Sequence, residues 1–543
     1  MKKIISFFLL FTAIIALFTT ICIYFTEKTD LMGLEHMPIE SSFSENDGNM
    51  VLSWKPFPYP CLYRVETYYK TTGLVEGSPE YHSLKSEYTI GSEYAVPTSA
   101  IPSYYQITAY GIFGKIATSK EYIPNPNFHD PVKPVPIFRY TKDKPASVIP
   151  YLVWHSVPDG VVYELEILSG QPDEENGTKI SRQNHVFSTQ QVFTNGIQFD
   201  MRPYYKKYPR LYWRVRAMNL RKEPLGVFSD TQEIVVDDSV AIPDKPLLNT
   251  FDRMPNFKMP IYPVYLWIPM YGAESYEVEL LTHPPAEENG TTPTEDAAWR
   301  MKVNSSFTCY DEYARPYAGT YYWRVRGLDA NGKMVGQYSD TASFEMDQSI
   351  QRCRVAIFGD SITHGGGAVS FSPASLEYSY LTYLDFPAVN LGKSGDTSRT
   401  TLERFESDVL PIRPMNLIIM TGSNSLRAAY IPAEAIIADL QTIGQKCEKN
   451  GIRPIFMTLP PLNPDNILLA FQTPTDPGWH AKMTAINEFI RKQRYFIDLE
   501  PYFYAKDKKI LDPKWANDGL HQDVYGKMLI GEIINQHQRL FKD

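Results

Sequence analysis

The sequence predicts a multidomain protein with an N-terminal transmembrane helix, about three all-β sandwich modules and a C-terminal α/β domain built in three layers around a doubly wound sheet. Three observations predict this: a long apolar run at the N-terminus, a Trp and Tyr motif recurring about every 110 residues, and alternating strand and helix patterns after residue 352. A chain of 543 residues is also too long for one hydrophobic core. The predicted domains are residues 1–26, 41–131, 132–240, 241–347 and 352–543.

The N-terminal run predicts where the protein lies. Lys2 and Lys3 precede 22 residues without a charge, from Ile4 to Phe25, and a helix of that length spans a bilayer. Because basic residues stay on the cytoplasmic side, the chain after this helix would be extracytoplasmic. We therefore expect a signal anchor that passes once through the cell membrane. A cleaved signal peptide and secretion are the alternative, although no Ala-x-Ala site follows the run.

The next three hundred residues contain a repeated pattern. Each copy has an apolar run that ends in Trp and, nine residues later, a Tyr that opens an alternating segment: Trp54 and Tyr63, Trp154 and Tyr163, Trp267 and Tyr276. The segment Tyr-Trp-Arg-Val-Arg recurs around Trp213 and Trp323. Strict alternation predicts half-buried antiparallel strands with Trp and Tyr inside, and the period is that of a small sandwich domain. The pattern resembles fibronectin type III modules.

The second and third copies share two further motifs. Glu-Glu-Asn-Gly-Thr occurs at 174–178 and 287–291, and Ser-Asp-Thr at 229–231 and 339–341. The acidic segments could hold calcium, but a solvated hairpin turn is the more frequent structure of such a stretch. Aromatic residues such as Tyr204, Tyr205 and Tyr208 could contact glycans, but core positions account for most Tyr in modules of this type.

The predicted secondary structure changes near residue 352 from strands alone to alternating strands and helices. Apolar runs at 355–358, 387–391, 416–420, 454–459 and 495–499 alternate with helical patterns near 398–410, 432–450, 478–494 and 523–541. Alternation of this kind predicts a parallel, doubly wound sheet of the flavodoxin-like type, whose strands end at one edge. The segment 460–479 could be a lid or a long connection.

A serine follows the first of these runs, in Gly-Asp-Ser. Ser361 could be a nucleophile if a base removes its proton and a third group orients that base. Asp518 and His521, three residues apart near the end of the chain, could supply both. Gly395 and Asn424 follow the next two runs, and they could join the Ser361 N–H around a developing oxyanion.

These residues, in this order, resemble the SGNH/GDSL hydrolases, whose four sequence blocks carry a serine, a glycine, an asparagine and a histidine. The resemblance covers about the last third of the chain. It implies that Ser361 is the nucleophile, Gly395 and Asn424 are oxyanion donors, His521 is the base, and Asp518 orients the base.

Details of the blocks modify this resemblance. Many relatives have Asp after the third-block Asn, whereas Ser425 follows here, so the support around Asn424 could differ. Gly-Asp-Thr in the second block is similar to the thioesterase and lysophospholipase branch. We expect Asp360 to shape its block without acid–base work. We expect His364 to be an exposed loop histidine beside Gly365, Gly366 and Gly367.

Composition excludes several other functions. A net charge of −9 argues against nucleic acid as a partner. Five cysteines stand without disulfide or metal spacing, and ten histidines include neither His-x-His nor His-Glu-x-x-His. We therefore expect no metal and no other cofactor.

Three functions remain. The first is a membrane-anchored extracytoplasmic serine esterase that removes O-acyl groups, chiefly O-acetyl, from a polysaccharide through a Ser-His-Asp acyl-enzyme mechanism, with the β modules as spacers or glycan binders. The second is a lysophospholipase or thioesterase, and the third is an adhesion or scaffold protein with an inactive hydrolase domain. The loop 364–368 has no bulky apolar residue, so we expect small acyl groups.

Overall fold

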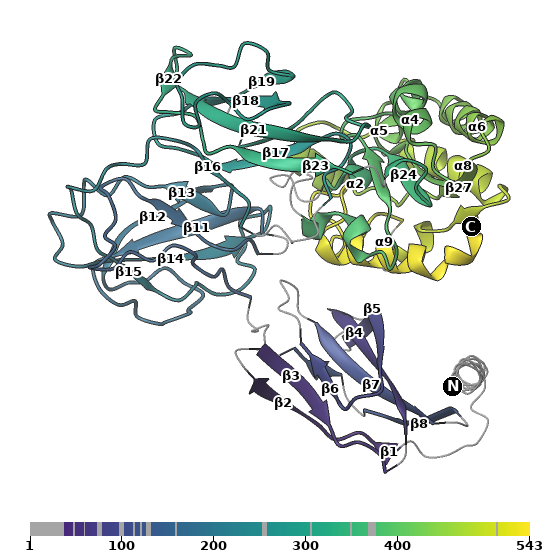
Figure 1. Cartoon of the computed structure of the whole chain (residues 1–543), viewed down its shortest axis with the longest axis horizontal. Helices are drawn as coiled ribbons and strands as arrows, with labels where there is room; N and C mark the ends of the chain where they lie inside the picture. Colours follow the sequence, from purple (N-terminus) through teal and green to yellow (C-terminus); the bar gives the residue numbers. More distant parts are fainter. Residues whose placement is uncertain are drawn as a thin grey trace, which may run out of the picture. The chain divides into compact units, whose positions relative to one another are not determined.

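The computed structural model describes residues 37–46, 49–58, 60–72, 79–96, 103–111, 114–119, 122–125, 132–157, 160–251, 258–304, 307–347, 350–366, 376–505 and 509–542. The chain divides into two compact units, Met1–Asp130 and Pro131–Asp543 (Figure 1). The predicted anchor, Ile4 to Phe25, lies outside the described residues. Within those ranges, no helix has both the length and the apolar character needed to cross a membrane.

The first unit contains two sheets. One has strands in the order β1 (Met37–Pro38), β8 (Gly114–Thr118), β7 (Tyr104–Gly111), β4 (Leu62–Thr72) and β5 (Pro79–Thr89), with β9 (Ile123–Pro124) paired to β7. The other has the order β2 (Ser41–Asn46), β3 (Asn49–Trp54) and β6 (Glu93–Ala95).

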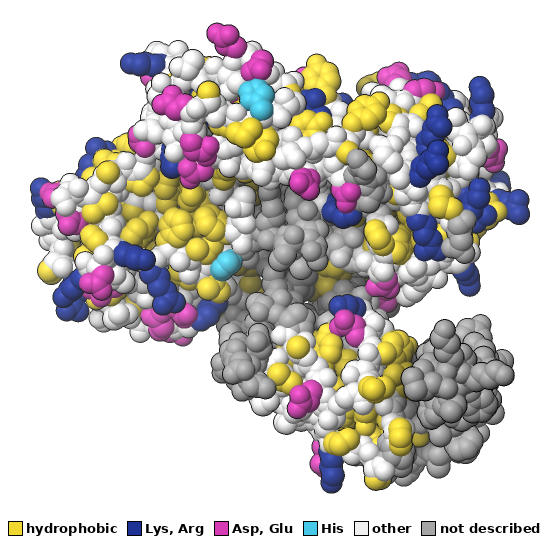
Figure 2. Space-filling model, in the orientation of Figure 1, with side chains coloured by type: hydrophobic (Ala, Val, Ile, Leu, Met, Phe, Trp, Pro, Cys, Tyr) yellow, Lys and Arg dark blue, Asp and Glu magenta, His cyan; other side chains and the backbone are white. Residues whose placement is uncertain are grey.

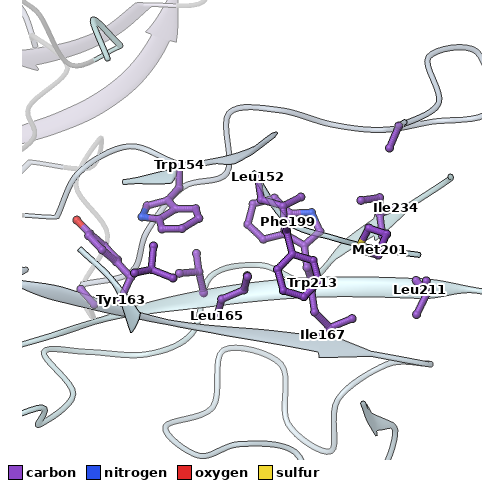
Figure 3. Close-up of a cluster of buried hydrophobic side chains, with 14 of the residues drawn as sticks. Leu152, Trp154, Tyr163, Leu165, Ile167, Phe199, Met201, Leu211, Trp213 and Ile234 are labelled. Atoms are coloured by element: carbon purple, nitrogen blue, oxygen red, sulfur yellow. The ribbon is translucent and has the colours of Figure 1, made fainter. Parts of the chain in front are cut away.

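The second β module, at the start of the second unit, also has two sheets. One pairs β10 (Tyr151–Val153) with β13 (Gly196–Gln198); the other has the order β12 (His185–Val192), β11 (Val162–Leu168), β14 (Leu211–Met218) and β15 (Gln232–Ile234). A buried cluster draws Leu152 and Trp154 from one sheet and Leu165 and Trp213 from the other, so the core lies between them (Figure 3). The three tyrosines considered for glycan contact are partly buried against this cluster: Tyr204, Tyr205 and Tyr208.

The third β module repeats the plan. One sheet has the order β16 (Leu247–Leu248), β17 (Val264–Ile268) and β20 (Thr308–Tyr310). The other has the order β19 (Trp299–Asn304), β18 (Ser275–Leu281), β21 (Gly319–Leu328) and β22 (Met334–Val335), with β23 (Ala342–Met346) paired to β21. The strand-rich architecture of the N-terminal region is therefore as predicted, while its resemblance to fibronectin type III modules stays a prediction.

The Trp and Tyr of the repeated motif have the same geometry in all three copies. Their ring centroids are 5.2, 5.2 and 5.3 Å apart in Trp54–Tyr63, Trp154–Tyr163 and Trp267–Tyr276. Each Tyr hydroxyl accepts a hydrogen bond from a main-chain N–H a few residues upstream: Phe57, Val157 and Met270. All six rings are buried, which confirms that this motif faces the interior.

The two shared motifs of the second and third modules recur together because they enclose a buried arginine. Arg214 pairs with Glu166 at 2.7 Å and donates to the Glu174 carbonyl at 2.9 Å; Arg324 pairs with Glu279 and donates to the Glu287 carbonyl at the same distances. Asn176 and Asn289 then donate to the main-chain carbonyl of the residue just before Ser-Asp-Thr, Phe228 and Tyr338 respectively. These segments act as turns. In the described ranges, no group of three His, Cys, Asp or Glu side chains could hold a metal ion.

The C-terminal domain is built on a five-stranded parallel sheet. Its order is β25 (Val389–Gly392), β24 (Val355–Gly359), β26 (Asn416–Met420), β27 (Arg453–Met457) and β28 (Phe496–Ile497). The first strand in sequence lies between the second and third, which is the doubly wound order we expected. The five predicted strand positions are confirmed.

The described helices occupy the four predicted regions, with further short helical segments outside them. They are α2 (Ser361–His364), η2 (Leu376–Tyr378), η3 (Tyr380–Tyr383), α3 (Ser398–Glu403), η4 (Phe405–Val409), α4 (Leu410–Ile412), α5 (Ser423–Arg427), α6 (Ala433–Lys449), α7 (Pro464–Phe471), α8 (Trp479–Arg491), η5 (Glu500–Tyr502), α9 (Val524–Gln536) and η6 (Gln538–Leu540). The helix predicted near 398–410 is interrupted by the π-helical segment η4. The predicted lid or connection contains α7, which begins at Pro464 after the Asn463 cap.

Candidate active site

Ser361 lies at the end of strand β24. The Asp360 side chain accepts the Ile362 N–H at 3.1 Å, so it caps the short helix that begins at the serine. Gly359, just before, has no room for a side chain, since a Cβ there would lie 2.2 Å from the Met420 carbonyl oxygen of the neighbouring strand. The strand therefore delivers the serine to the edge where active sites of such sheets lie.

Ser361, His521 and Asp518 form a continuous chain of hydrogen bonds. Ser361 Oγ is 2.7 Å from His521 Nε2, and His521 Nδ1 is 2.8 Å from Asp518 Oδ2. The other Asp518 oxygen accepts the Leu520 and His521 N–H groups, each at 2.8 Å. The carboxylate is fully buried and therefore held in one orientation. The structure thus brings together the three residues that the sequence predicted.

Glycines allow this geometry at two positions. Gly519 has a φ of +78°, and a Cβ there would lie 2.4 Å from the Asn463 carbonyl oxygen, so the turn between Asp518 and His521 requires glycine. Gly366 lies against the histidine ring, since a Cβ at that position would be 3.1 Å from His521 Cδ2.

The two remaining predicted site residues, Gly395 and Asn424, follow strands β25 and β26. Gly395 has a φ of +86°, and the space where its Cβ would be is open. Asn424, on α5, donates from Nδ2 to the Asp396 carbonyl at 3.0 Å, which joins the two loops. Among the described residues, the Gly395 N–H has no hydrogen-bond acceptor.

Ser425 supports this arrangement in its own way. Its Oγ accepts the Ser398 N–H at 3.0 Å, and the Ser398 hydroxyl donates to Asp439 Oδ2 at 2.8 Å. The serine that stands where many relatives have Asp therefore connects α5 to the start of α3, while the carboxylate comes from Asp439 on α6.

The prediction for His364 was wrong. Its side chain is only 1% exposed, with Nε2 2.9 Å from the Tyr262 carbonyl oxygen and Nδ1 3.2 Å from the Ser394 amide nitrogen. Burial lowers the pKa of His364 to about 3, so the ring is neutral, donates from Nε2 and accepts at Nδ1. The glycine-rich neighbourhood of His364 predicted an exposed loop. The prediction failed because the residue that buries the ring, Tyr262, lies 102 residues away and leaves no local signal.

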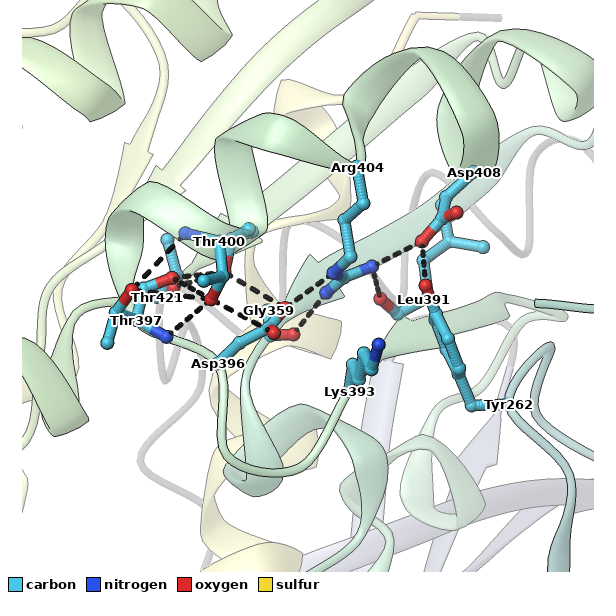
Figure 4. Close-up of polar contacts among 12 residues, drawn as sticks. Tyr262, Gly359, Leu391, Lys393, Asp396, Thr397, Thr400, Arg404, Asp408 and Thr421 are labelled. Carbon is cyan, nitrogen blue, oxygen red and sulfur yellow. Dashed lines mark hydrogen bonds and ion pairs between the residues drawn. The ribbon is translucent and has the colours of Figure 1, made fainter. Parts of the chain in front are cut away.

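An arginine that the sequence did not identify lies behind the site. Arg404 pairs with Asp396 and with Asp408, and it donates to the Gly359 carbonyl at 2.7 Å (Figure 4). The Tyr262 hydroxyl, from the third β module, donates to the same Asp408 carboxylate at 2.7 Å. Arg404 thus connects the strand before the serine, the loop after Gly395 and the β module.

Two buried ionisable groups lie beneath the serine. Burial raises the pKa of Asp360 to about 6 and lowers the pKa of Lys527 to about 7. The Lys527 ammonium donates to the Ile362 carbonyl at 2.6 Å, so it holds the short helix that begins with Ser361.

Apolar side chains lie on the histidine side of the site. The Phe471 ring, at the end of α7, meets the His521 ring edge-on, with centroids 6.0 Å apart. The Arg427 guanidinium lies over the Phe471 ring, with Cζ 5.1 Å from the ring centroid. Leu468 and Leu469 on the same helix are 50% and 46% exposed. Of the two alternatives that the sequence left open for the segment 460–479, a lid or a long connection, this contact with the histidine favours the lid.

Comparison with known proteins adds the family. No curated protein matches the chain. Similar solved structures include a lipase/acylhydrolase from Enterococcus faecalis (21% identity over 35% of this chain and 96% of that chain, TM-score 0.28) and a catalytic mutant of an acetylxylan esterase from Geobacillus stearothermophilus (20% identity, 34% and 92%, TM-score 0.26). Residues 357–527 match the GDSL-like Lipase/Acylhydrolase family. This segment is therefore a GDSL-type acylhydrolase domain, and the protein is a serine ester hydrolase.

Proposed function

We propose that this hydrolase removes small O-acyl groups, chiefly O-acetyl, from a carbohydrate outside the cytoplasm. The observation that carries the chemistry is the hydrogen-bonded chain from Ser361 through His521 to Asp518. In this proposal Ser361, His521 and Asp518 are the catalytic triad, and the oxyanion donors are the Ser361 and Gly395 N–H groups and the Asn424 amide.

The mechanism follows from these contacts. His521 Nε2 takes the Ser361 proton as Oγ attacks the ester carbonyl, and Asp518 stabilises the imidazolium through Nδ1–H. The three donors stabilise the negative charge on the former carbonyl oxygen. The imidazolium then protonates the leaving alcohol, which gives an acyl-enzyme. Water that His521 deprotonates attacks this intermediate, releases the acid and restores the serine.

Exposed tyrosines beside the site support a carbohydrate substrate. Tyr313 and Tyr317 are 60% and 64% exposed on the loop that follows Tyr310, and the neighbouring Glu312 carbonyl accepts Lys393 Nζ at 3.1 Å. This contact holds the loop next to the Gly395 segment. Tyrosine combines a flat apolar face with a polar hydroxyl, which suits the face of a sugar ring.

The apolar surface on α7 favours the second candidate, a lysophospholipase or thioesterase. Phe471, Leu468 and Leu469 could accept part of a long acyl chain, and each buried CH₂ contributes about 0.8 kcal/mol.

One experiment compares the candidates directly. The purified protein is given p-nitrophenyl esters from acetate to octanoate, and an acetylated polysaccharide beside lysophosphatidylcholine. We expect the highest kcat/KM with acetate, a fall by butyrate, and release of acetate from the polysaccharide. A preference for octanoate with hydrolysis of the lysophospholipid would replace the carbohydrate proposal with the lipid one. Absence of hydrolysis of every ester would favour an adhesion or scaffold protein.

We also propose a single-pass anchor at the N-terminus, with the acylated polysaccharide as the partner and no nucleic acid. On the face in Figure 2, Lys and Arg are interspersed with Asp and Glu, and the net charge is −9, which supports the last part. We expect the full-length protein in the membrane fraction, with its β modules cut by protease added outside the cytoplasmic membrane. Full-length protein free in the cytosol would contradict the anchor.

A further inference from the structure

The third β module contacts the loop that carries Gly395. The Tyr310 hydroxyl, at the end of β20, donates to the Ser394 carbonyl oxygen at 2.8 Å. The same tyrosine ring meets the His364 ring edge-on, with centroids 5.2 Å apart. Among the described residues, Tyr310 is the one donor to this carbonyl.

This hydrogen bond acts on the proposed oxyanion donor through covalent geometry. The Ser394 C=O and the Gly395 N–H belong to one peptide group, which is planar and trans, so they point in opposite directions. A donor that fixes the carbonyl therefore also fixes the direction of the N–H.

The peptide group on the other side of Ser394 is held as well. Its N–H donates to His364 Nδ1 at 3.2 Å, and His364 Nε2 in turn meets the Tyr262 carbonyl. Gly395 itself, with a φ of +86°, has a backbone that can rotate easily. The orientation of the Ser394–Gly395 peptide therefore depends on the hydroxyl of Tyr310.

We propose that Tyr310 is a positioning residue for the ester hydrolase: through the Ser394 carbonyl, it aims the Gly395 N–H at the oxyanion. The inference rests on the proposed role of Gly395. It makes the third β module a part of the active site and not only a spacer.

Other contacts hold the module against the hydrolase domain, so the effect of this hydroxyl can be isolated. The Ile261 N–H donates to the Asn390 carbonyl at 3.2 Å, Lys393 Nζ to the Glu312 carbonyl at 3.1 Å, and the Tyr262 hydroxyl to Asp408 at 2.7 Å. Removal of the Tyr310 hydroxyl leaves all of these contacts in place.

The test is Tyr310→Phe in the full chain, which keeps the ring against His364 and removes only the hydroxyl. A whole oxyanion donor contributes about 10²–10³ in kcat, so a donor that is misdirected part of the time should cost about 10-fold. We expect that loss in kcat on p-nitrophenyl acetate, with KM within about twofold and an unchanged pH profile, because neither substrate binding nor His521 is altered.

Tyr140→Phe is the matched control. Tyr140 is also half-buried and also donates to a main-chain carbonyl, that of Tyr151, at 2.6 Å, but it lies in the second module. We expect its kcat to equal that of the unaltered protein. A general loss of tyrosine hydrogen bonds would lower both variants alike and would overturn the inference.

A crystal structure of Tyr310→Phe gives a readout that does not need activity. We expect the Ser394–Gly395 peptide to rotate or to occupy two orientations. One unrotated peptide, or a kcat equal to that of the unaltered protein, would overturn the inference and leave the proposed function standing. Failure of the proposed function would instead appear in the unaltered protein, as absence of ester hydrolysis, and it would remove the catalytic role of Tyr310 whether or not the peptide rotates in the variant.

Discussion

In the second and third β modules, the residues at one equivalent strand position make different contacts. Gln198 pairs with Tyr151, three residues before Trp154, and Tyr310 pairs with Val264, three residues before Trp267. Gln198 reaches the next module, where its Nε2 donates to the Pro243 carbonyl and its Oε1 accepts the Tyr271 N–H, each at 2.7 Å. Tyr310 reaches the next domain, at the Ser394 carbonyl.

The difference lies in what each side chain holds. Gln198 fixes a connection between two β modules, so we expect its role to be structural. Tyr310 fixes the peptide group that precedes the proposed oxyanion donor, so the same position acquires an effect on catalysis. A domain contact therefore becomes functional when its partner is a main-chain group of the active site.

Ser361→Ala should have the largest effect on activity, and its loss of hydrolysis is the maximum against which the Tyr310 variant is compared. We expect hydrolysis of p-nitrophenyl acetate to fall by about 10⁴-fold or more, because the nucleophile is lost. The melting temperature should stay within a few degrees, since the serine lies at a strand end and both β modules are unaffected. Near-normal turnover of the folded variant would exclude this site.

Destabilising the second and third β modules separately, by replacing the buried arginine of each, should affect activity differently. Arg214→Met and Arg324→Met each remove the buried arginine that pairs with a buried glutamate, Glu166 or Glu279. Glu166 keeps His185 and Glu279 keeps Arg300, so we expect each loss to lie below the about 3–5 kcal/mol of a fully unpaired buried charge. We expect activity to be lost at a lower urea concentration in the Arg324 variant, because the third module supports the Gly395 loop. Unfolding by circular dichroism and activity are measured in the same urea series. Identical urea dependence of activity in the two variants would contradict a catalytic contribution specific to the third module.

Asn424→Ala should lower kcat by about 10²–10³, the contribution of one oxyanion donor. Asn450→Ala is the control, since Asn450 also donates its amide to a main-chain carbonyl, that of Lys446, at 2.8 Å, but at the exposed end of α6. Steady-state kinetics of both variants on p-nitrophenyl acetate checks the expectation. An equal kcat in the two variants would remove Asn424 from the oxyanion site.

Acid should lower the free energy of unfolding of the hydrolase domain, because it contains the buried His364 that contacts the third β module. Burial lowers the pKa of His364 from 6.5 to about 3 in the folded protein. Between these values the unfolded chain binds a proton that the folded chain does not, so stability rises with pH and is lost as the pH falls through this window. We expect a slope of about 1.4 kcal/mol per pH unit in urea unfolding between pH 6 and 4, relative to His364→Gln. Parallel pH curves for the two proteins would contradict a buried neutral His364.

Much of the α/β domain followed from local patterns. The five apolar runs became the five strands, and the helical pattern near 432–450 became α6, which buries Ile436, Leu440 and Ile443. Ser361 was predicted from its place after a strand, and the structure places it there. Both predictions, for Ser361 and for His364, rested on the local sequence. That was enough to place Ser361 after a strand, but the glycines beside His364 could not show that the third β module packs over this histidine.

Arg404 shows what no local pattern contained. It lies on the helical stretch predicted near 398–410, where an arginine is usually solvated, yet it is 8% exposed between Asp396 and Asp408. Its burial depends on Tyr262, 146 residues before Asp408. Helical periodicity gives the face of a residue but not which side chain another domain packs against that face.

The sequence by itself determined the positions of Ser361, Gly395, Asn424 and His521 at strand and helix ends, because strand and helix periods are properties of neighbouring residues. Only the tertiary structure decided that Tyr310 lies against Ser394, 84 residues further along the chain. A main-chain carbonyl accepts a hydrogen bond whatever its side chain, so Ser394 carries no sign of the contact, and a tyrosine in a strand does not reveal which carbonyl its hydroxyl will reach.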